Sequence, residues 1–142
     1  MHRNTAEADV ETIDSILRTM YELLSGPAGA ARDWTRFRSL FIEGARLMPI
    51  VSEVGKAVIR VLTVEEYIQR VEAIFEKENF WERETERKAE QIGNFAHVLS
   101  AYESLRSPEG PPFEHGVNSI QIFYDGKRWW VVSSMWNTSR DQ

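Results

Sequence analysis

The polar residues that could do chemistry concentrate in one predicted β-hairpin, residues 80–103. Gly93 and Asn94 lie between two extended runs, and both residue types tolerate the positive φ of a two-residue hairpin turn. Counting outward from this turn places His97 opposite Glu90. A carboxylate beside an imidazole can orient or charge it, and the pair would form a general-base dyad if it faced the interior. The alternative is an exposed or interfacial cross-strand pair with a structural role.

Two acidic residues of the same hairpin form a second candidate. The register sets Glu84 opposite Glu103. Two carboxylates at one site raise the pKa of one of them, as acid/base catalysis often requires. Like charges directly opposite each other also destabilise a sheet. A bulge that offsets the two residues, or screening by Arg83 and Arg106, is therefore the alternative interpretation.

The hairpin face that we assign to the interior carries a third set of polar residues. This face has two charged residues, whereas the opposite face, which includes Glu82, has six and a histidine. Unpaired charges are rarely buried, so the less charged face is predicted to point inward. Buried polar side chains need partners, so this set either bonds internally or points at a ligand, and an arginine there would suit an anionic group. The set consists of Thr85, Arg87, Ser100 and Tyr102.

Aromatic residues could supply flat apolar walls for a ligand. The chain has five tryptophans in 142 residues, and flat walls suit steroid-like or polyketide ligands. Ordinary core packing is the alternative explanation. The aromatic candidates are Tyr21, Trp34, Tyr67, Trp129 and Trp136.

Composition argues against several classes of site. The absence of cysteine excludes disulfides, thiolate metal sites and cysteine nucleophiles. Three scattered histidines lack metal-ligand spacing, and no phosphate-binding or dinucleotide motif occurs, so we expect no metal and no cofactor. A net charge of −5 opposes nucleic-acid binding. We find no signal peptide and no apolar run near the roughly 20 residues of a membrane span, and we expect a cytoplasmic protein.

Apolar residues at helical spacing before residue 80 predict three helices. Asp33 is a plausible cap of the second helix. Thr63 and Glu66 form a capping box at the start of the third. The predicted helices cover residues 10–24, 34–41 and 63–78.

Strand patterns fill the rest of the chain. Short strands are predicted at residues 45–51 and 57–62, and four long strands follow over residues 80–138. Helices early and strands late predict an α+β fold, in which three helices cover the concave face of a curved antiparallel sheet. Such a cone leaves a space that is either filled or hollow. The length predicts one domain, residues 1–142.

The second long hairpin is apolar on both faces. A strand without alternation is buried on both sides, which suggests that the outer face meets another subunit. The hairpin turns at Asp125-Gly126, and a turn of two residues or of three with a bulge would swap the faces. Which face of residues 117–124 and 129–136 lines the interior is left open.

Three segments resemble the nuclear transport factor 2-like superfamily and, within it, the SnoaL-like group. The resemblance spans nearly the whole chain. It implies a cone-shaped, cystatin-like fold with a pocket between helices and sheet, and often a homodimer formed through the sheet. Members include isomerases, dehydratases, polyketide cyclases, epoxide hydrolases and non-catalytic binding or dimerisation domains, so the fold alone carries no reaction. The segments are residues 33–41 (DWTRFRSLF), 93–98 (GNFAHV) and 118–130 (NSIQ through DGKRWW).

Two functions follow as hypotheses. The first is a cofactor-independent enzyme that moves a proton on a small apolar organic substrate by isomerisation, dehydration or cyclisation. It requires at least one titratable side chain inside the cone, with His97 and Glu90 as catalytic candidates. The second is a non-catalytic ligand-binding or dimerisation module. In either case the expected ligand contacts are Tyr21, Trp34, Tyr67, Arg87, Ser100, Tyr102 and Trp129.

Overall fold

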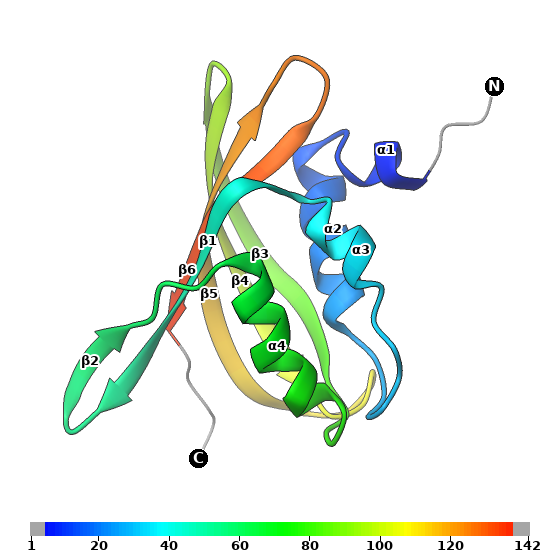
Figure 1. Ribbon diagram of the computed structural model, residues 1–142, viewed down its shortest axis with the longest axis vertical. Helices are drawn as coiled ribbons and strands as arrows, with labels where there is room; N and C mark the ends of the chain where they lie inside the picture. Colours follow the sequence, from blue (N-terminus) through cyan, green and yellow to red (C-terminus); the bar gives the residue numbers. More distant parts are fainter. Residues whose placement is uncertain (1–4, 138–142) are drawn as a thin grey trace.

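A computed structural model describes residues 5–137, with side chains from residue 7 onward. Its centre is a curved six-stranded sheet in the order β2-β1-β6-β5-β4-β3 (Figure 1). Neighbouring strands are antiparallel except β1 and β6, which run parallel, so the sheet is mixed where we predicted a purely antiparallel one. Residue 138, the predicted end of the last strand, lies outside the described residues. The strands are β1 (Phe41–Glu53), β2 (Lys56–Ile59), β3 (Trp81–Ile92), β4 (Phe95–Leu105), β5 (Pro112–Tyr124) and β6 (Trp129–Asn137).

The longer helices lie on the same side of the sheet (Figure 1). Helix α2 packs against β3, and α4 packs against β1. The core between helices and sheet contains fully buried side chains from both layers, among them Ile16, Phe37, Val98 and Ile120. No helix in residues 5–137 has the length and apolar character needed to cross a membrane. The helices are α1 (Thr5–Asp9), α2 (Ile13–Leu24), α3 (Trp34–Arg38) and α4 (Val64–Phe75).

Capping side chains set where the helices begin. The predicted capping box is confirmed: the Glu66 amide donates to Thr63 Oγ1 at 3.1 Å, and the Thr63 amide donates to Glu66 Oε1 at 2.9 Å. Thr12 and Ser15 form the same arrangement, which starts α2 three residues later than predicted. The chain before it forms the separate helix α1.

Asp33 caps α3 as predicted, because its side chain accepts from the Arg36 amide at 3.0 Å. The helix ends at Arg38, short of the predicted end at residue 41. Phe41 instead opens β1, where it pairs with Val131 of β6. Strand β1 is consequently much longer than the predicted strand.

The register of the β3–β4 hairpin is as predicted near the turn and shifted farther out. Glu90 pairs with His97, and Arg87 pairs with Ser100, as expected. A bulge between Glu84 and Glu86 then moves Glu84 opposite Tyr102. The predicted Glu84–Glu103 pair is therefore wrong, and the bulge that we gave as the alternative is present.

The bulge also reverses the faces of the far end of β3. Because side chains alternate along a strand, a one-residue shift turns Glu82 and Glu84 to the interior. Glu82 and Glu84 are partly buried, whereas Arg83 and Thr85, which we predicted to point inward, are exposed. On β4 the prediction is confirmed, since Ala96, Val98, Ser100 and Tyr102 are all buried.

The β5–β6 hairpin settles the face that the sequence left open. Tyr124 pairs with Trp129, so the loop has four residues and fits neither predicted turn. Asp125 closes it by accepting from the amides of Lys127 and Arg128 at 2.8 and 2.9 Å. The inward face carries Asn118, Ile120, Ile122, Val131 and Ser134, all buried.

Candidate functional site

A pocket of about 330 Å³ opens between α4 and the concave face of the sheet. A space of this size suits a small organic molecule. Most of its wall is apolar, as such pockets usually are. The wall includes Met20 and Leu24 from α2, Leu47, Pro49 and Val51 from β1, Tyr67, Val71, Ile74 and Phe75 from α4, and Phe37, Phe80, Phe113 and Trp136.

The polar floor of the pocket comes from three neighbouring strands. Glu82 of β3, Ser104 of β4 and Glu114 of β5 lie side by side in register. Tyr102 precedes Ser104 by two residues, and Asn118 lies farther along β5. Because residues two apart on a strand share a face, these side chains point toward the same space. All but Ser104 line the pocket directly.

Glu82 is the titratable group best placed for chemistry. Burial raises its pKa to about 8, and the negative charge of Glu114 adds to the shift. Ser104 Oγ, 3.4 Å away, donates to its Oε2 and partly offsets the rise in pKa. Near pH 7 the Glu82 side chain is therefore mostly a neutral carboxylic acid, which loses its proton slightly above neutrality. A group with such a pKa can both donate and accept a proton in this pH range.

Two tyrosine hydroxyls line the same pocket. Burial raises the pKa of Tyr67 and of Tyr102, and the charge of Glu82 raises both further. Both phenols therefore stay protonated and can donate hydrogen bonds. The Tyr67 ring lies between two other rings. It stacks on Phe37 at a ring-centroid distance of 5.9 Å and meets Trp136 edge-on at a ring-centroid distance of 5.8 Å.

Arg106 anchors one side of the pocket. Its guanidinium lies 3.8 Å from the ring centroid of Phe113. It also pairs with Glu78 at 2.8 Å and donates to the Asn79 carbonyl at 3.1 Å. Since Arg106, Glu78 and Phe113 all line the pocket, these contacts fix the segment after α4 to the β4–β5 connection.

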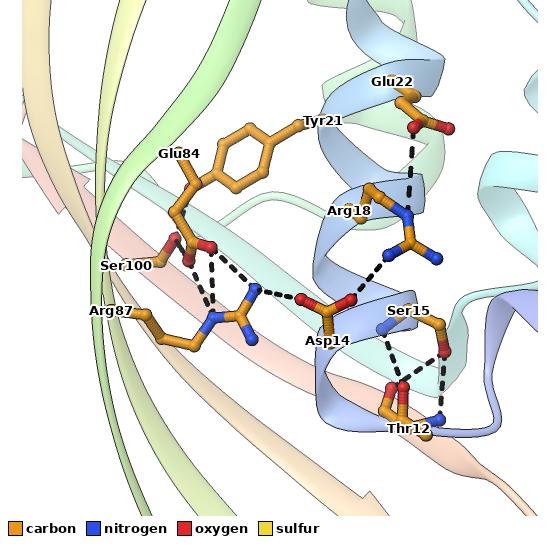
Figure 2. Close-up of polar contacts among 9 residues, drawn as sticks. All are labelled: Thr12, Asp14, Ser15, Arg18, Tyr21, Glu22, Glu84, Arg87 and Ser100. Carbon is orange, nitrogen blue, oxygen red and sulfur yellow. Dashed lines mark hydrogen bonds and ion pairs between the residues drawn. The ribbon is translucent and has the colours of Figure 1, made fainter.

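A chain of polar side chains continues from Asn118 away from the pocket. Asn118 Nδ2 donates to the Tyr21 hydroxyl at 2.9 Å, and that hydroxyl lies 2.7 Å from Ser100 Oγ. Ser100 Oγ donates to Glu84 Oε2 at 2.5 Å, and Glu84 pairs with Arg87 at 2.6 Å (Figure 2). These contacts join β3, β4, β5 and α2 through buried polar groups.

The predicted ligand residues are divided among several places. Tyr67 and Tyr102 line the pocket. Tyr21, Ser100 and Arg87 belong to the adjoining polar chain.

Two further predicted aromatic residues, Trp34 and Trp129, lie outside both the pocket and the polar chain. The Trp34 ring stacks on Phe75 with a ring-centroid distance of 6.3 Å. It lines a second, smaller pocket beside α4. Trp129 packs against Tyr124, 5.2 Å away, at the β5–β6 turn, and is buried in the core.

His97 and Glu90 lie on the outer face of the sheet, remote from the pocket. Both residues are exposed, and their backbone positions pair as the sequence predicted. His97 Nε2 is 2.9 Å from Ser119 Oγ of the neighbouring strand. The alternation along β4 places His97 opposite to its buried neighbours Ala96 and Val98. The geometry therefore matches the cross-strand pair that we gave as the alternative to a dyad.

Four residues of the polar floor were not among the predicted site residues: Glu82, Ser104, Glu114 and Asn118. Strict alternation along β3 placed Glu82 on the outer face, and the bulge reverses it. The one available sign was the unfavourable pairing of Glu84 with Glu103, which a bulge would relieve. Glu114 fell within a predicted loop before β5.

Within the described residues, no three histidine, aspartate or glutamate side chains converge in a way that could hold a metal ion. The polar groups that the described pocket offers include the carboxyl groups of Glu82 and Glu114, the phenols of Tyr67 and Tyr102 and the Asn118 amide, in a mostly apolar enclosure.

No protein-family model matches the sequence, and no curated protein sequence is significantly similar to it. Several experimental structures share its fold at low identity. A Nostoc punctiforme protein of unknown function with a cystatin-like fold superposes with a TM-score of 0.68 at 12% identity, over 89% of this chain and 88% of that one. A second match is a Novosphingobium aromaticivorans chain, ascribed to the β subunit of an aromatic-ring-hydroxylating dioxygenase. It superposes with a TM-score of 0.63 at 14% identity, over 98% of this chain and 94% of that one.

A third structure carries a family name. A Streptomyces avermitilis protein of the NTF2-like family, to which a dehydratase activity has been ascribed, gives a TM-score of 0.62 at 17% identity, over 94% of this chain and 98% of that one. These matches agree with the mixed, unclosed sheet and the helices on its concave face. The chain therefore has a cystatin-like fold, as seen in nuclear transport factor 2-like (NTF2-like) proteins.

Proposed function

We propose that this protein binds a small, largely apolar organic molecule in the pocket and moves a proton on it without a cofactor. The observation that carries the proposal is the Glu82 carboxyl group on the floor of an apolar pocket, beside the Tyr102 phenol. Isomerisation, dehydration and cyclisation all need a group that removes or supplies a proton and a donor that stabilises a developing oxyanion.

The residues divide these roles. The ionised Glu82 carboxylate would take a proton from a carbon next to a substrate carbonyl, and the carbonyl oxygen would take up the negative charge. Tyr102 or Tyr67 would donate a hydrogen bond to that oxygen, because both phenols stay protonated. Glu82 would then return the proton at another carbon, or give it to a departing hydroxyl group.

The dehydratase activity ascribed to the Streptomyces avermitilis protein supports this class of reaction. Membership of the SnoaL-like group is a further part of the proposal, supported by the sequence segments that resemble it. A cytoplasmic location also remains a prediction.

We further propose that two copies of the chain associate through the outer face of the sheet. That face carries exposed apolar side chains in adjacent positions: Leu99 and Met135 both pair with Ser119, and Val117 lies on the next row. Leu99 is 40% exposed, Met135 36% and Val117 50%. Clustered apolar side chains on a sheet face are typical of a protein interface.

The alternative function is a non-catalytic binding or dimerisation module. The exposed apolar side chains of Leu99, Val117 and Met135 favour it, since this part of the outer face could serve assembly without any use of the pocket. The β-subunit description of the Novosphingobium aromaticivorans chain supports this alternative.

Proton exchange on a simple ketone separates the two functions. In D₂O, the wild-type protein should accelerate deuterium incorporation next to the carbonyl of 1-tetralone, measured by NMR. Glu82→Gln should lower the acceleration by about 100-fold, because general-base catalysis contributes at least that much. The rate should rise with pH around 8, since only the ionised carboxylate accepts a proton.

Glu86→Gln is the matched control, because it removes the same charge from an exposed residue of the same strand. It should exchange deuterium at the wild-type rate. Equal rates for wild-type protein and Glu82→Gln would contradict the enzyme and favour the binding module.

A further inference from the structure

A chain of hydrogen bonds leads from an ion pair to the wall of the pocket. Arg87 holds the Glu84 carboxylate with Nε, 3.1 Å from both oxygens, and with Nη2, 2.6 Å from Oε1. Ser100, Tyr21 and Asn118 follow in order, at 2.5, 2.7 and 2.9 Å. Figure 2 shows the part from Arg87 to Tyr21. These last three are buried, with 0%, 4% and 7% exposure, so water has little access to replace a missing member.

In this chain of hydrogen bonds, each residue can donate in one direction only. A carboxylate paired with an arginine only accepts hydrogen bonds, so Ser100 donates to Glu84. Ser100 has a single hydroxyl proton, so Tyr21 must donate to Ser100. The Tyr21 oxygen must then accept from Asn118, and only the amide nitrogen of Asn118 can donate. The arrangement of the Asn118 side-chain amide is therefore fixed by the Glu84 charge, which lies on the same face of the sheet, two strands away.

We infer that this directional chain makes Asn118 a hydrogen-bond acceptor in the pocket, which selects ligands that carry a hydroxyl or N–H group at that position. Asn118 lines the pocket, and one hydrogen of its NH₂ group is engaged by Tyr21, which fixes the amide so that its Oδ1 is the acceptor it offers to a ligand. A ligand without a donor there would leave the carbonyl oxygen unpaired. The inference rests on the proposed function, because it concerns what the same pocket recognises.

Glu84 and Arg87 are positioning residues in this account, since neither lines the pocket. Replacing Glu84 by glutamine should reverse the chain. Arg87 would hold the glutamine oxygen, which turns the glutamine NH₂ group toward Ser100. Ser100 would then donate to Tyr21, and Tyr21 would donate to Asn118, which must rotate its amide and present its NH₂ group to the pocket.

The orientation of the Asn118 amide can be tested by comparing the binding of two probes of the same shape. Indole only donates a hydrogen bond, and benzofuran only accepts one. Titrations followed by protein NMR should show wild-type protein binding indole about tenfold more tightly than benzofuran, because an unpaired carbonyl oxygen is costly. Glu84→Gln should bind benzofuran at least as tightly as indole. Tyr21→Phe, which cuts the chain, should bind the two probes within about twofold of each other.

Glu86→Gln removes the same charge outside the chain and should keep the wild-type preference. A melting curve for each variant verifies that it is folded. The ligand-free proteins supply a second measurement, nuclear Overhauser contacts between the Asn118 side-chain NH₂ and the Tyr21 ring. These contacts should be present in wild-type protein and weakened in Glu84→Gln, even if no probe binds.

The outcomes separate the two proposals. Wild-type protein that binds both probes equally would overturn the inference and leave the proposed function standing. Wild-type protein that binds neither probe at millimolar concentration would overturn the pocket as a site for small aromatic molecules, and the ligand preference with it. An Asn118 NH₂ group that lies away from Tyr21 in wild-type protein would overturn the directional chain itself.

Discussion

Glu82 faces the pocket because one extra residue interrupts the pairing of β3. The bulge turns an acidic side chain toward an apolar space where its charged form is poorly solvated. Glu114 lies on β5, two strands from Glu82, and its negative charge further opposes ionisation of the Glu82 carboxyl group. A pocket carboxyl group is thus kept protonated near neutrality by its neighbours and by its position on the sheet.

This environment predicts a pH-dependent cost to stability. In the unfolded chain the Glu82 carboxyl should titrate near its ordinary pKa of 4.5, and in the folded chain near 8. Between these values the unfolded chain has lost a proton that the folded chain retains, so the contribution to stability falls as pH rises and is constant above 8. Glu82→Gln removes this dependence. The free energy of unfolding of the variant, minus that of wild-type protein, should therefore increase from pH 5 to 8, by at most about 1.4 kcal/mol per pH unit.

Denaturant unfolding at several pH values measures the difference. Glu86→Gln, which removes a charge from an exposed residue beyond the bulge, is the matched control. A Glu82→Gln difference that stays constant over the same pH range would contradict the desolvated carboxyl group.

Gly116 makes room for the Tyr102 ring. A Cβ atom at this position would lie 2.3 Å from the Tyr102 hydroxyl oxygen and 2.4 Å from Cζ. Gly116→Ala should therefore displace the ring and lower stability by roughly 1–3 kcal/mol. In a Tyr102→Ala background the same substitution should cost far less, as a double-mutant cycle of unfolding free energies would show. If the stability costs of Gly116→Ala and Tyr102→Ala simply added in the double variant, the close contact between Gly116 and the Tyr102 ring would be contradicted.

Helix α4 forms the wall of the pocket that faces the sheet. Its N-terminus depends on the Thr63 side chain, which satisfies the Glu66 amide. Thr63→Ala should cost about 1 kcal/mol of stability and speed hydrogen exchange at the start of α4. Thr35→Ala, at an exposed position within α3, should change stability by a few tenths of a kcal/mol at most. Unchanged exchange in α4 would argue against this role of the cap.

The elements that follow from local rules are predictable from the sequence. The Thr63–Glu66 box, the Asp33 cap and the Gly93–Asn94 turn each depend on neighbouring residues, and all three are confirmed. Tyr67 and Tyr102 were correctly placed in the interior because helical and strand periodicity report burial.

The features that sequence reasoning missed depend on distant contacts. The bulge beside Thr85 carries no glycine and resembles the rest of the strand, so its one sign in the sequence is the unfavourable pairing of Glu84 with Glu103 that it relieves. The parallel pairing of β1 with β6 joins segments about 90 residues apart, and no local pattern encodes it. The polar floor of the pocket combines three strands, so one register shift was enough to hide Glu82.

For the whole molecule, the proposed dimer predicts that a charge on the outer face separates the subunits. Leu99 is an exposed apolar residue of that face, so Leu99→Asp should leave the monomer folded and disrupt association. Sedimentation should give twice the chain mass of 16.5 kDa for wild-type protein and the chain mass for the variant. Val54→Asp, at the fully exposed tip of the β1–β2 hairpin, is the control and should sediment as wild-type protein does. A wild-type monomer would contradict the dimer.

The most direct test of the account is the titration of the Glu82 carboxyl group itself. With ¹³C-labelled glutamate, the carboxyl carbon of Glu82, assigned by its absence in Glu82→Gln, reports ionisation by its chemical shift. The structure predicts a midpoint near pH 8. Glu114→Gln should lower that midpoint, because it removes the neighbouring negative charge. A midpoint between pH 4 and 5 in wild-type protein would mean that the group is solvated and ionised, and the proposed proton chemistry would lose its basis.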